Sequence, residues 1–420
     1  MKSLVVLGCG IAGECLPDFE GRTPVEAADT SSLDKLTACG ESGGWETIRP
    51  GGWPGPEATL SEFFGINETL PPGPLEAVGA GVDLGEGEIA FRANFVCLRP
   101  GTTSVLMFDA AGCGISDEEG ASITAHLNGN ILCDSDEVIR LISLGGYRAL
   151  LTYQKRGFKA ADQAIAAFSP PHEIMGQPIG GHLPTLNEAR RFVHIVNDSQ
   201  MILAGHPGLK KKQETAMFAA NSLWLWGGGV LPRIAPIFRL LGGRNAVMVS
   251  NCRAALGMGQ LGGAQVGQPS ETGAAGRAEM VKAAREALRE NDFVMLCVDD
   301  PAEALLASNF EGLTASIEAI DKEIIGPLIE DPGAGEPCRI LALSDRVGSL
   351  GPSPWAMAEW RAGALHPPAP PGGLTGLWRN LTRGRLTAAP SPRTDVFSEK
   401  LCENWPPLSG KALRMRLLAK

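Results

Sequence analysis

The feature that most constrains the fold of this chain is a series of short apolar runs that alternate with helical stretches. The runs are rich in leucine and β-branched residues, as strands buried on both faces of a parallel sheet usually are. They are Ser3–Leu7, Ala246–Ser250, Phe293–Val298 and Arg339–Leu343. Helical stretches lie between the later runs at Ala275–Glu290 and Thr314–Ile325, and the second places four isoleucines on one face. Alternation of strand and helix predicts an α/β domain with a parallel sheet.

The middle of the chain, roughly from Glu76 to Arg239, follows a different pattern. It is rich in glycine and proline, and its apolar runs are shorter and mixed. This pattern is typical of an α+β insertion. With 420 residues the chain is long enough for two domains. We therefore predict an α/β domain built from residues 1–75 and 240–420, and a smaller inserted α+β domain at residues 76–239.

The overall composition excludes several classes of protein. A formal net charge of −10 argues against a general nucleic-acid binder, because binding phosphate backbones needs a concentrated positive surface. No apolar run reaches the roughly eighteen residues that a membrane-spanning helix needs. The ten cysteines are scattered without a Cys-x-x-Cys pair, which indicates neither a zinc site nor a disulfide framework. We therefore expect reduced thiols and a cytoplasmic protein that binds no nucleic acid and no membrane.

The last part of the chain, residues 366–420, has the opposite charge. It holds nine Lys or Arg residues against three Asp or Glu residues, and its first half is rich in proline and glycine. One interpretation is a basic strap that lies on the acidic body of the same chain. The other is a docking segment for a protein partner. Both interpretations stay open at this point, and no pattern indicates an oligomeric state.

A glycine motif follows the first apolar run. Gly8, Gly10 and Gly13 match the spacing G-x-G-x-x-G, in which glycines let the pyrophosphate of a dinucleotide approach the start of a helix. A Rossmann-type flavoprotein is therefore one alternative. That fingerprint also requires a helix directly after the glycines and an acidic residue at the end of a second strand. Pro17 and Gly21 interrupt the expected helix, so we disfavour this alternative.

A longer series of segments resembles one family. The segments Gly21–Thr30 (GRTPVEAADT) and Leu33–Leu36 (LDKL) are similar to GKTPLEVADTPNMDRLA of the archaeal-type cofactor-independent phosphoglycerate mutases. Further matches follow in the same order. They are Gly73–Ala77, Ala90–Asn94, Ser116–Glu119, Tyr147–Arg148, Pro170–Ile179, His206–Pro207 and Ala220–Gly227. The agreement runs to about Trp355, with a weaker likeness at Phe397–Glu399, and so covers nearly the whole chain.

The resemblance to this 2,3-bisphosphoglycerate-independent family, part of the alkaline-phosphatase superfamily, implies a fold and a glycolytic chemistry. The implied fold is an alkaline-phosphatase-like α/β domain assembled from both chain ends and interrupted by a smaller substrate-covering domain. The implied chemistry moves a phosphoryl group between the 2- and 3-hydroxyls of glycerate through a phosphoserine. It uses two divalent metals such as Mn, Mg or Zn, which clamp the attacking and leaving oxygens and lower the pKa of the nucleophile.

At most positions where the resemblance implies a nucleophile or a metal ligand, this chain has another residue. Cys9 stands at the Asp of the family's amino-terminal Gly-Asp-Gly. Pro56 stands at the nucleophilic Ser of PPGSDVANL, with Glu57 at the neighbouring Asp. Proline has no hydroxyl, so no phosphoserine can form there. In the family's APDEAGH segment, Ala302 and Leu306 replace the Asp and the His.

Of the seven side chains that the resemblance implies, one is present. Asp345 stands at the Asp of the family's PDH segment, Arg346 replaces its His, and the His of a later THT segment has no counterpart in residues 347–351. One carboxylate beside a permanent cation cannot hold two divalent metals, because hard cations need several oxygen or imidazole ligands. We therefore expect no metal and no cofactor. We also expect Arg346 to neutralise Asp345 through an ion pair.

Several polar residues of the inserted domain and its rim are retained. They are Arg92, Asn94, Asp109, Arg148, His172 and His206. Some of these positions face the substrate in the family, and a guanidinium suits phosphate or carboxylate because its planar fork donates two parallel hydrogen bonds. A small phosphorylated acid is therefore the ligand that we expect. The alternative is that these residues have structural roles, while Trp224 and Trp226 alternate like one face of a strand in the core.

Together, the resemblance and the losses predict a phosphoglycerate-mutase-like protein that works as a non-catalytic binding or regulatory homologue, a pseudoenzyme of an isomerase family. Two further alternatives stay open. An active mutase or related phosphotransferase could use replacement ligands, and it would then require a divalent metal. A thiol site could form if Cys9 and Cys113 met beside a base.

Overall fold

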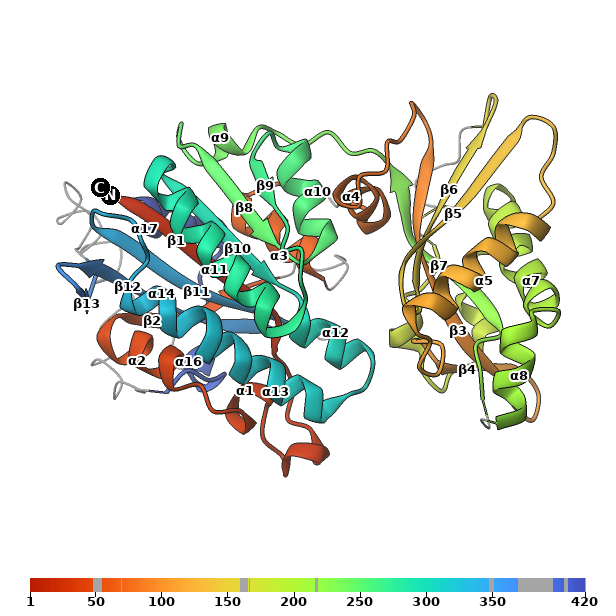
Figure 1. Cartoon of the computed structure of the whole chain (residues 1–420), viewed down its shortest axis with the longest axis horizontal. Helices are drawn as coiled ribbons and strands as arrows, with labels where there is room; N and C mark the ends of the chain where they lie inside the picture. Colours follow the sequence, from red (N-terminus) through yellow and green to blue (C-terminus); the bar gives the residue numbers. More distant parts are fainter. Residues whose placement is uncertain are drawn as a thin grey trace. The chain divides into compact units, whose positions relative to one another are not determined.

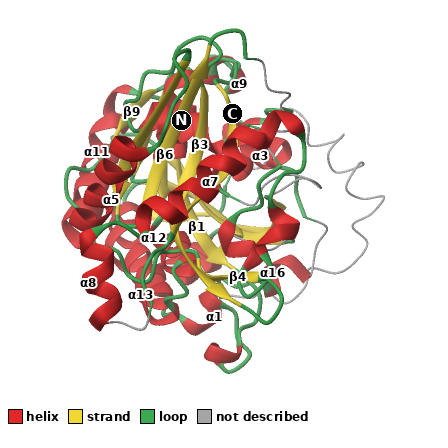
Figure 2. Ribbon diagram, turned by 90° about the vertical axis from the view of Figure 1, so that its right-hand side faces the viewer, coloured by secondary structure: helices red, strands yellow, loops and turns green. Residues whose placement is uncertain are grey.

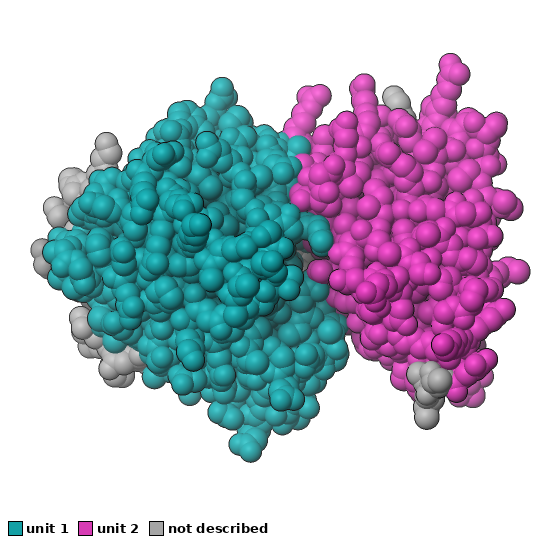
Figure 3. Space-filling model, in the orientation of Figure 1, with its two compact units in different colours: residues 1–69, 234–420 teal, residues 70–233 magenta. Residues whose placement is uncertain are grey.

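The computed structural model describes residues 1–47, 55–68, 70–158, 165, 167–215, 218–346, 351–368, 396–403 and 407–419. The chain divides into two compact units (Figure 3). Unit 1 is Met1–Thr69 with Ile234–Lys420, and unit 2 is Leu70–Arg233. The boundaries that we place from the sequence, after residues 75 and 239, each fall six residues later.

Unit 1 contains an eight-stranded, mostly parallel sheet (Figure 1). Its order is β13-β12-β11-β1-β10-β8-β9, and β2 pairs with β12. The strands are β1 (Lys2–Ala12), β2 (Glu41–Glu46), β8 (Ala246–Ser250), β9 (Gln265–Gly267), β10 (Phe293–Val298), β11 (Cys338–Arg346), β12 (Pro352–Arg361) and β13 (Ala364–His366). The five strands from β11 to β9 are parallel, whereas β2, β12 and β13 are antiparallel. The predicted α/β fold with a sheet built from both chain ends is confirmed.

Helices cover both faces of this sheet. They are η1 (Pro17–Phe19), α1 (Pro24–Ala27), α2 (Ser31–Cys39), α3 (Pro56–Phe64), α9 (Ile237–Leu240), α10 (Arg253–Leu261), α11 (Gly273–Glu290), α12 (Asp300–Leu306), α13 (Phe310–Ile320), η5 (Asp321–Ile325), α14 (Gly326–Glu330), α16 (Lys400–Glu403) and α17 (Gly410–Leu418). Alternate residues of β10 show the two faces, because successive strand side chains point to opposite sides. Phe293 packs against Phe63 and Phe64 of α3, while Val294 and Leu296 join the core beneath α11 and α13.

The first strand is longer than the sequence pattern predicts. We expect a strand that ends at Leu7, but β1 continues through the glycine motif to Ala12. Gly8 still pairs with Val298 on one side and Ser344 on the other, and a bulge separates this pairing from Ala12. Two parallel neighbours supply backbone partners beyond the apolar run, which explains the extension. Gly8 and Gly10 therefore lie within a strand and Gly13 directly follows it, so the motif does not lie at the start of a helix as a dinucleotide fingerprint requires.

The predicted helix at Thr314–Ile325 is divided. It consists of α13 and the π-helical segment η5, both of which place isoleucines in the core. The extra residue per turn in η5 directs the buried Asp321 towards α2, where its carboxylate accepts hydrogen bonds from the backbone of Ser32 at 2.8 Å and Leu33 at 2.7 Å. One helix thus caps the amino terminus of another.

Unit 2 is an antiparallel sheet covered by helices, which is an α+β arrangement. Its strand order is β4-β3-β6-β5, and β7 pairs with β3. The strands are β3 (Ile89–Pro100), β4 (Val105–Asp109), β5 (Glu137–Gly145), β6 (Arg148–Lys155) and β7 (Ser222–Val230). The helices are α4 (Pro72–Gly79), α5 (Asp117–Asn130), η2 (Pro171–Ile174), η3 (Ile179–His182), η4 (Asn187–Ala189), α7 (Arg190–Leu203) and α8 (Pro207–Thr215). Figure 2 shows β3 and β6 side by side, and Phe91, Phe192 and Trp224 belong to the core between the sheet and its helices.

The described parts of the basic tail pack on unit 1. Glu399 accepts hydrogen bonds from the Thr23 hydroxyl at 2.6 Å and from the Gly13 backbone at 3.1 Å. Arg416 of α17 forms an ion pair with Glu41 at 2.5 Å. This is the arrangement that the strap interpretation describes, although residues 369–395 lie outside the described part. In that described part, no helix is both long enough and apolar enough to cross a membrane.

Candidate functional site

The carboxyl ends of the parallel strands in unit 1 are where an α/β sheet usually binds its ligands. Cys9 lies at this edge on β1 and is fully buried. A hydrogen bond with Cys297 of β10, together with burial and the nearby charge of Asp345, raises the pKa of the Cys9 thiol well above its usual value. This thiol is therefore protonated at neutral pH, which disfavours both nucleophilic attack and metal binding.

Asp345, which the resemblance aligns with a metal ligand, lies near Cys9 at the end of β11. It is completely buried, and its Oδ1 accepts a hydrogen bond from the backbone N–H of Gly10. Burial raises the pKa of Asp345 to about 6, and the charge of Glu57 raises it as well, although the Gly10 bond acts in the opposite direction. Its Oδ2 has no hydrogen-bond partner in the described part of the protein. A buried carboxyl group with this pKa is only partly ionised near neutral pH.

The expected ion pair between Asp345 and Arg346 does not form among the described residues. The two residues are consecutive on β11, so their side chains leave opposite faces of the sheet. Arg346 instead donates its Nε to the carbonyl of Pro352 at 3.0 Å. The hypothesis of local neutralisation by Arg346 is therefore wrong, because strand geometry separates the two groups.

Pro56, which the resemblance aligns with the family's nucleophile, is the first residue of α3. Pro56 and the following Glu57 are both buried. Proline suits the first position of a helix, because its backbone nitrogen needs no partner there and its φ angle is already helical. The residue thus fits its local structure well but presents no hydroxyl for phosphorylation.

The remaining positions of the expected site are apolar and close-packed. On α12, Ala302 is buried and Leu306 is half-buried. Gly10 has a φ of +77°, and a Cβ atom on it would lie 2.8 Å from the Cα of Ala302, so α12 packs directly on the backbone of β1. In the described ranges, no group of three or more His, Cys, Asp or Glu side chains is arranged to hold a metal ion. The residues present therefore do not fit the two divalent metals that the family resemblance implies.

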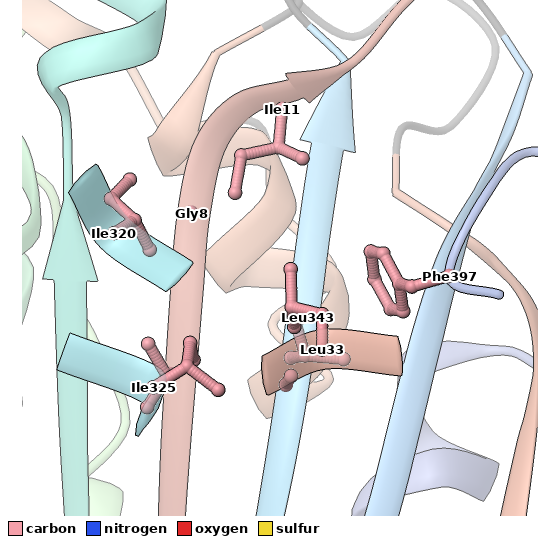
Figure 4. Close-up of a pocket in the computed structure, with 9 residues that line it drawn as sticks. Gly8, Ile11, Leu33, Ile320, Ile325, Leu343 and Phe397 are labelled. Carbon is pink, nitrogen blue, oxygen red and sulfur yellow. The ribbon is translucent and has the colours of Figure 1, made fainter. Parts of the chain in front are cut away.

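A small cavity lies beneath this edge but offers no ligand site. Gly8, Ile11, Ile320 and Phe397 are among its apolar lining residues (Figure 4). Its volume is ≈ 10 Å³, which is at most enough for a single water molecule. Phe397 brings the carboxy-terminal tail into this lining, so the tail contributes to the core next to β1.

Unit 2 brings three of the six retained polar residues together around Trp226. The guanidinium of Arg92 lies over the Trp226 ring at 4.9 Å, and the ring of His172 meets the same indole edge-on at 5.4 Å. Asn94 Oδ1 accepts a hydrogen bond from Trp226 Nε1 at 2.9 Å. Arg92 also donates its Nε to Glu76 at 2.6 Å. This group, Arg92, Asn94, His172, Trp226 and Glu76, is called the Trp226 cluster below.

His172 is the polar residue of the Trp226 cluster with an unused hydrogen-bonding atom. Its Nε2 is buried and has no partner in the described part of the chain. Burial, and secondarily the charge of Arg92, lowers the pKa of His172 to about 4. The imidazole is therefore neutral at physiological pH, with one ring nitrogen that can still bond to a water molecule or a ligand.

Of the other three residues, Asp109 and His206 have separate local positions, and Arg148 lies opposite a member of the Trp226 cluster. Asp109 Oδ1 accepts from the backbone of Ala111 and Cys113, both at 2.8 Å, and thereby closes a turn. Arg148 is paired with Asn94 in the register of β6 and β3. His206 Nδ1 accepts from the backbone of Leu209 at 3.2 Å, which leaves Nε2 protonated, next to the Ser122 hydroxyl at 3.1 Å. Asp109 and His206 thus support turns and helix ends.

The two cysteines that we considered as a thiol site have other neighbours. The hydrogen-bonding neighbour of Cys9 is Cys297 in unit 1, whereas that of Cys113 is Cys97 in unit 2. Burial raises the pKa of Cys113 to about 12. Neither thiol is activated as a nucleophile.

Sequence reasoning missed two members of the Trp226 cluster. Trp226 is expected only as a core residue, and Glu76 is not expected at all. The available signal is the alternation along β3 and β7, because Arg92 and Trp226 are paired residues of these strands. A buried arginine also needs a counter-ion, which Glu76 supplies.

The structure defines an α/β protein with an inserted antiparallel domain, and its described residues show no group of metal-ligating side chains at the carboxyl edge. Comparison with solved structures supports this fold. The fold resembles a protein from Pyrococcus horikoshii with a TM-score of 0.63 at 20% identity, covering 99% of this chain and 97% of that one. It also resembles a cofactor-independent phosphoglycerate mutase from Thermoplasma acidophilum with a TM-score of 0.50 at 19% identity, covering 100% and 99% of the two chains.

Sequence comparisons then place the chain in a family. Residues 37–208 match the pattern of the 2,3-bisphosphoglycerate-independent phosphoglycerate mutases. A probable mutase of this name from Geobacter sulfurreducens is 33% identical over 358 residues, which cover 83% of this chain and 87% of the relative. One from Methanothrix thermoacetophila is 32% identical over 375 residues, covering 85% and 91%. The chain belongs to the 2,3-bisphosphoglycerate-independent phosphoglycerate mutase family.

Proposed function

We propose that this chain is a non-catalytic member of its family that works by binding a small phosphorylated acid. The observation that carries the proposal is the composition of the carboxyl-edge site. Cys9, Pro56, Ala302 and Leu306 supply neither a hydroxyl nucleophile nor a ligand set for divalent metals. Phosphoryl transfer through a phosphoserine needs both, because two cations must stabilise the charge on the attacking and leaving oxygens.

The Trp226 cluster supports the binding part of the proposal. Arg92 provides a fixed cation, and its stacking on Trp226 together with the Glu76 bond orients the guanidinium. The neutral His172 adds a hydrogen-bonding atom beside it. A phosphate or carboxylate group suits this combination, since both accept hydrogen bonds from an arginine fork.

The catalytic part is tested with one preparation of the purified full-length protein. It is equilibrated with Mn²⁺, Mg²⁺ or Zn²⁺, its metal content is measured by mass spectrometry, and the conversion of 3-phosphoglycerate to 2-phosphoglycerate is assayed. We expect no retained stoichiometric metal and no turnover. About two metals per chain together with chelator-sensitive turnover would show that the chain is an active mutase with replacement ligands.

The binding part is tested by isothermal titration of 3-phosphoglycerate without metal. We expect binding to wild-type protein and a loss of at least about tenfold in affinity for Arg92→Met, because a charged hydrogen bond contributes roughly 1.5–3 kcal/mol. Arg140→Met is the matched control, since Arg140 lies in the same unit, is half exposed and pairs with Glu88. Equal affinity in all three proteins would remove Arg92 from the binding site.

A further inference from the structure

A second charged network lies at the carboxyl edge of the sheet in unit 1. Arg277 of α11 donates its Nε to Glu323 at 2.7 Å and its Nη1 to Asp300 at 2.8 Å. Asp300 begins α12, and Glu323 lies in η5. One guanidinium, with a side chain only 13% exposed, therefore joins three helical segments.

The network continues to the ends of two neighbouring strands. The other carboxylate oxygen of Asp300 accepts a hydrogen bond from the side-chain amide of Asn251 at 2.5 Å. Asn251 follows β8, and its own amide oxygen accepts from the backbone of Asp299, which follows β10, at 2.9 Å. Both oxygens of Asp300 thus have protein partners.

This arrangement bears on how the chain could bind a cation. Asp300 opens residues 300–306, the segment that the family resemblance aligns with metal ligands, so it is one of the carboxylates that could replace the missing Asp. Burial opposes the charge of Arg277, but the hydrogen bonds that it donates to Glu323 and Asp300 outweigh burial and raise the pKa of the guanidinium. The Asp300 carboxylate is therefore already paired with a cation, shared with Glu323, that stays charged at all ordinary pH values.

We propose that Arg277 is an internal counter-ion that holds α12 and the adjoining strand ends in place without a divalent cation. The guanidinium acts as a positioning group, since it touches Asp300 and Glu323 and no reacting atom. This inference rests on one part of the proposed function, which is that the protein uses no divalent metal. The native fold of unit 1 should then be indifferent to chelators and to added divalent metals.

The test is thermal unfolding of the full-length protein with EDTA and with Mn²⁺. Wild-type Tm should be the same in both, because a ligand that does not bind the native state cannot stabilise it. Arg277→Met should lower Tm by about 4–8 °C, since it leaves two carboxylates without their cation. Arg277→Lys should fall in between, because a lysine keeps the charge but not the fork. Arg289→Met, at an exposed position of the same helix, is the control and should shift Tm by less than about 2 °C.

A double-mutant cycle with Asp300→Asn isolates the interaction. The double variant Arg277→Met/Asp300→Asn should lose less than the sum of the two single losses, because the ion pair is counted twice in that sum. A rise of wild-type Tm with Mn²⁺, or a loss in Arg277→Met no larger than in Arg289→Met, would overturn the proposal. If Arg277→Met does not fold, Arg277→Lys and its cycle with Asp300→Asn decide. If the mutase assay shows turnover while the Tm does not change with metal, the proposed function is wrong but the inference about Arg277 still holds.

Discussion

At position 56 the proline side chain lacks the hydroxyl group that a phosphoserine needs. Introducing that hydroxyl with a serine should not by itself produce catalysis. We expect Pro56→Ser to show no mutase turnover with Mn²⁺, because Cys9, Ala302 and Leu306 still provide no metal ligands. We also expect a loss of about 0.5–1 kcal/mol in unfolding free energy, since proline limits the unfolded chain. A coupled assay and a denaturant titration measure both. Metal-dependent turnover in Pro56→Ser would mean that replacement ligands exist.

His172 should make stability depend on pH. Its pKa is about 4 in the folded protein, below the ordinary value near 6.5, so between these values the unfolded chain binds the proton and the folded chain does not. Stability is therefore complete above about pH 6.5 and declines towards pH 4, by up to roughly 3 kcal/mol. His172→Gln should flatten this decline in urea titrations at several pH values.

The comparison must be made between variants, because a second group titrates in the same range. The pKa of Asp345 is raised to about 6, so the folded protein binds its proton more readily than the unfolded chain, and its contribution declines as pH rises. The variant Asp345→Asn should remove only the part of the pH dependence of stability that comes from Asp345. If His172→Gln has the same pH profile as wild type, the imidazole is not buried as the structure describes.

At the scale of elements, α17 and α3 are joined by a side chain that caps a helix end. Arg414 of α17 donates hydrogen bonds to the carbonyls of Phe63 and Phe64, at the carboxyl end of α3. We expect Arg414→Met to lower the unfolding free energy by about 2–3 kcal/mol, because two buried carbonyls lose a charged donor. Lys411→Met, at an exposed position of the same helix, is the control for denaturant unfolding and should change little. Equal losses in the two variants would show that the cap is not stabilising.

The elements also show what the sequence could and could not predict. The runs at Ala246–Ser250 and Phe293–Val298 correspond to β8 and β10, because a strand buried on both faces must be apolar throughout. The extension of β1 and the π-helical turn of η5 depend on partners from distant parts of the chain, which local periodicity does not contain. The same limit applies to the site. The sequence shows directly that Pro56 has no hydroxyl and that Ala302 has no carboxylate. The stacking of Arg92 on Trp226 depends on the pairing of β3 with β7, so it cannot be predicted from the sequence.

At the scale of the whole molecule, the basic tail should behave as part of unit 1. If a specific protease site is inserted within residues 369–395 and cleaved, we expect the fragment that carries α16 and α17 to stay bound. Glu399, Arg414 and Arg416 hold it through hydrogen bonds and ion pairs to distant segments. Native mass spectrometry should find both fragments together and separate them only in denaturant. Release of the fragment in native buffer would favour the docking-segment interpretation.

The close approach of α12 to Gly10 limits how a metal site could be built in this chain by substitution. If the chain is non-catalytic as we propose, positions 9, 56, 302 and 306 would all need new side chains, and α12 packs closely on the backbone of β1 at Ala302. We therefore expect that no single substitution builds a metal site. Each single substitution that introduces a metal ligand would leave a buried carboxylate or imidazole without its cation. This would lower the free energy of unfolding until all ligands of the metal are present. Under the proposed function, metal-dependent chemistry would thus require several substitutions together, and we expect each single-step intermediate to be less stable than the present protein.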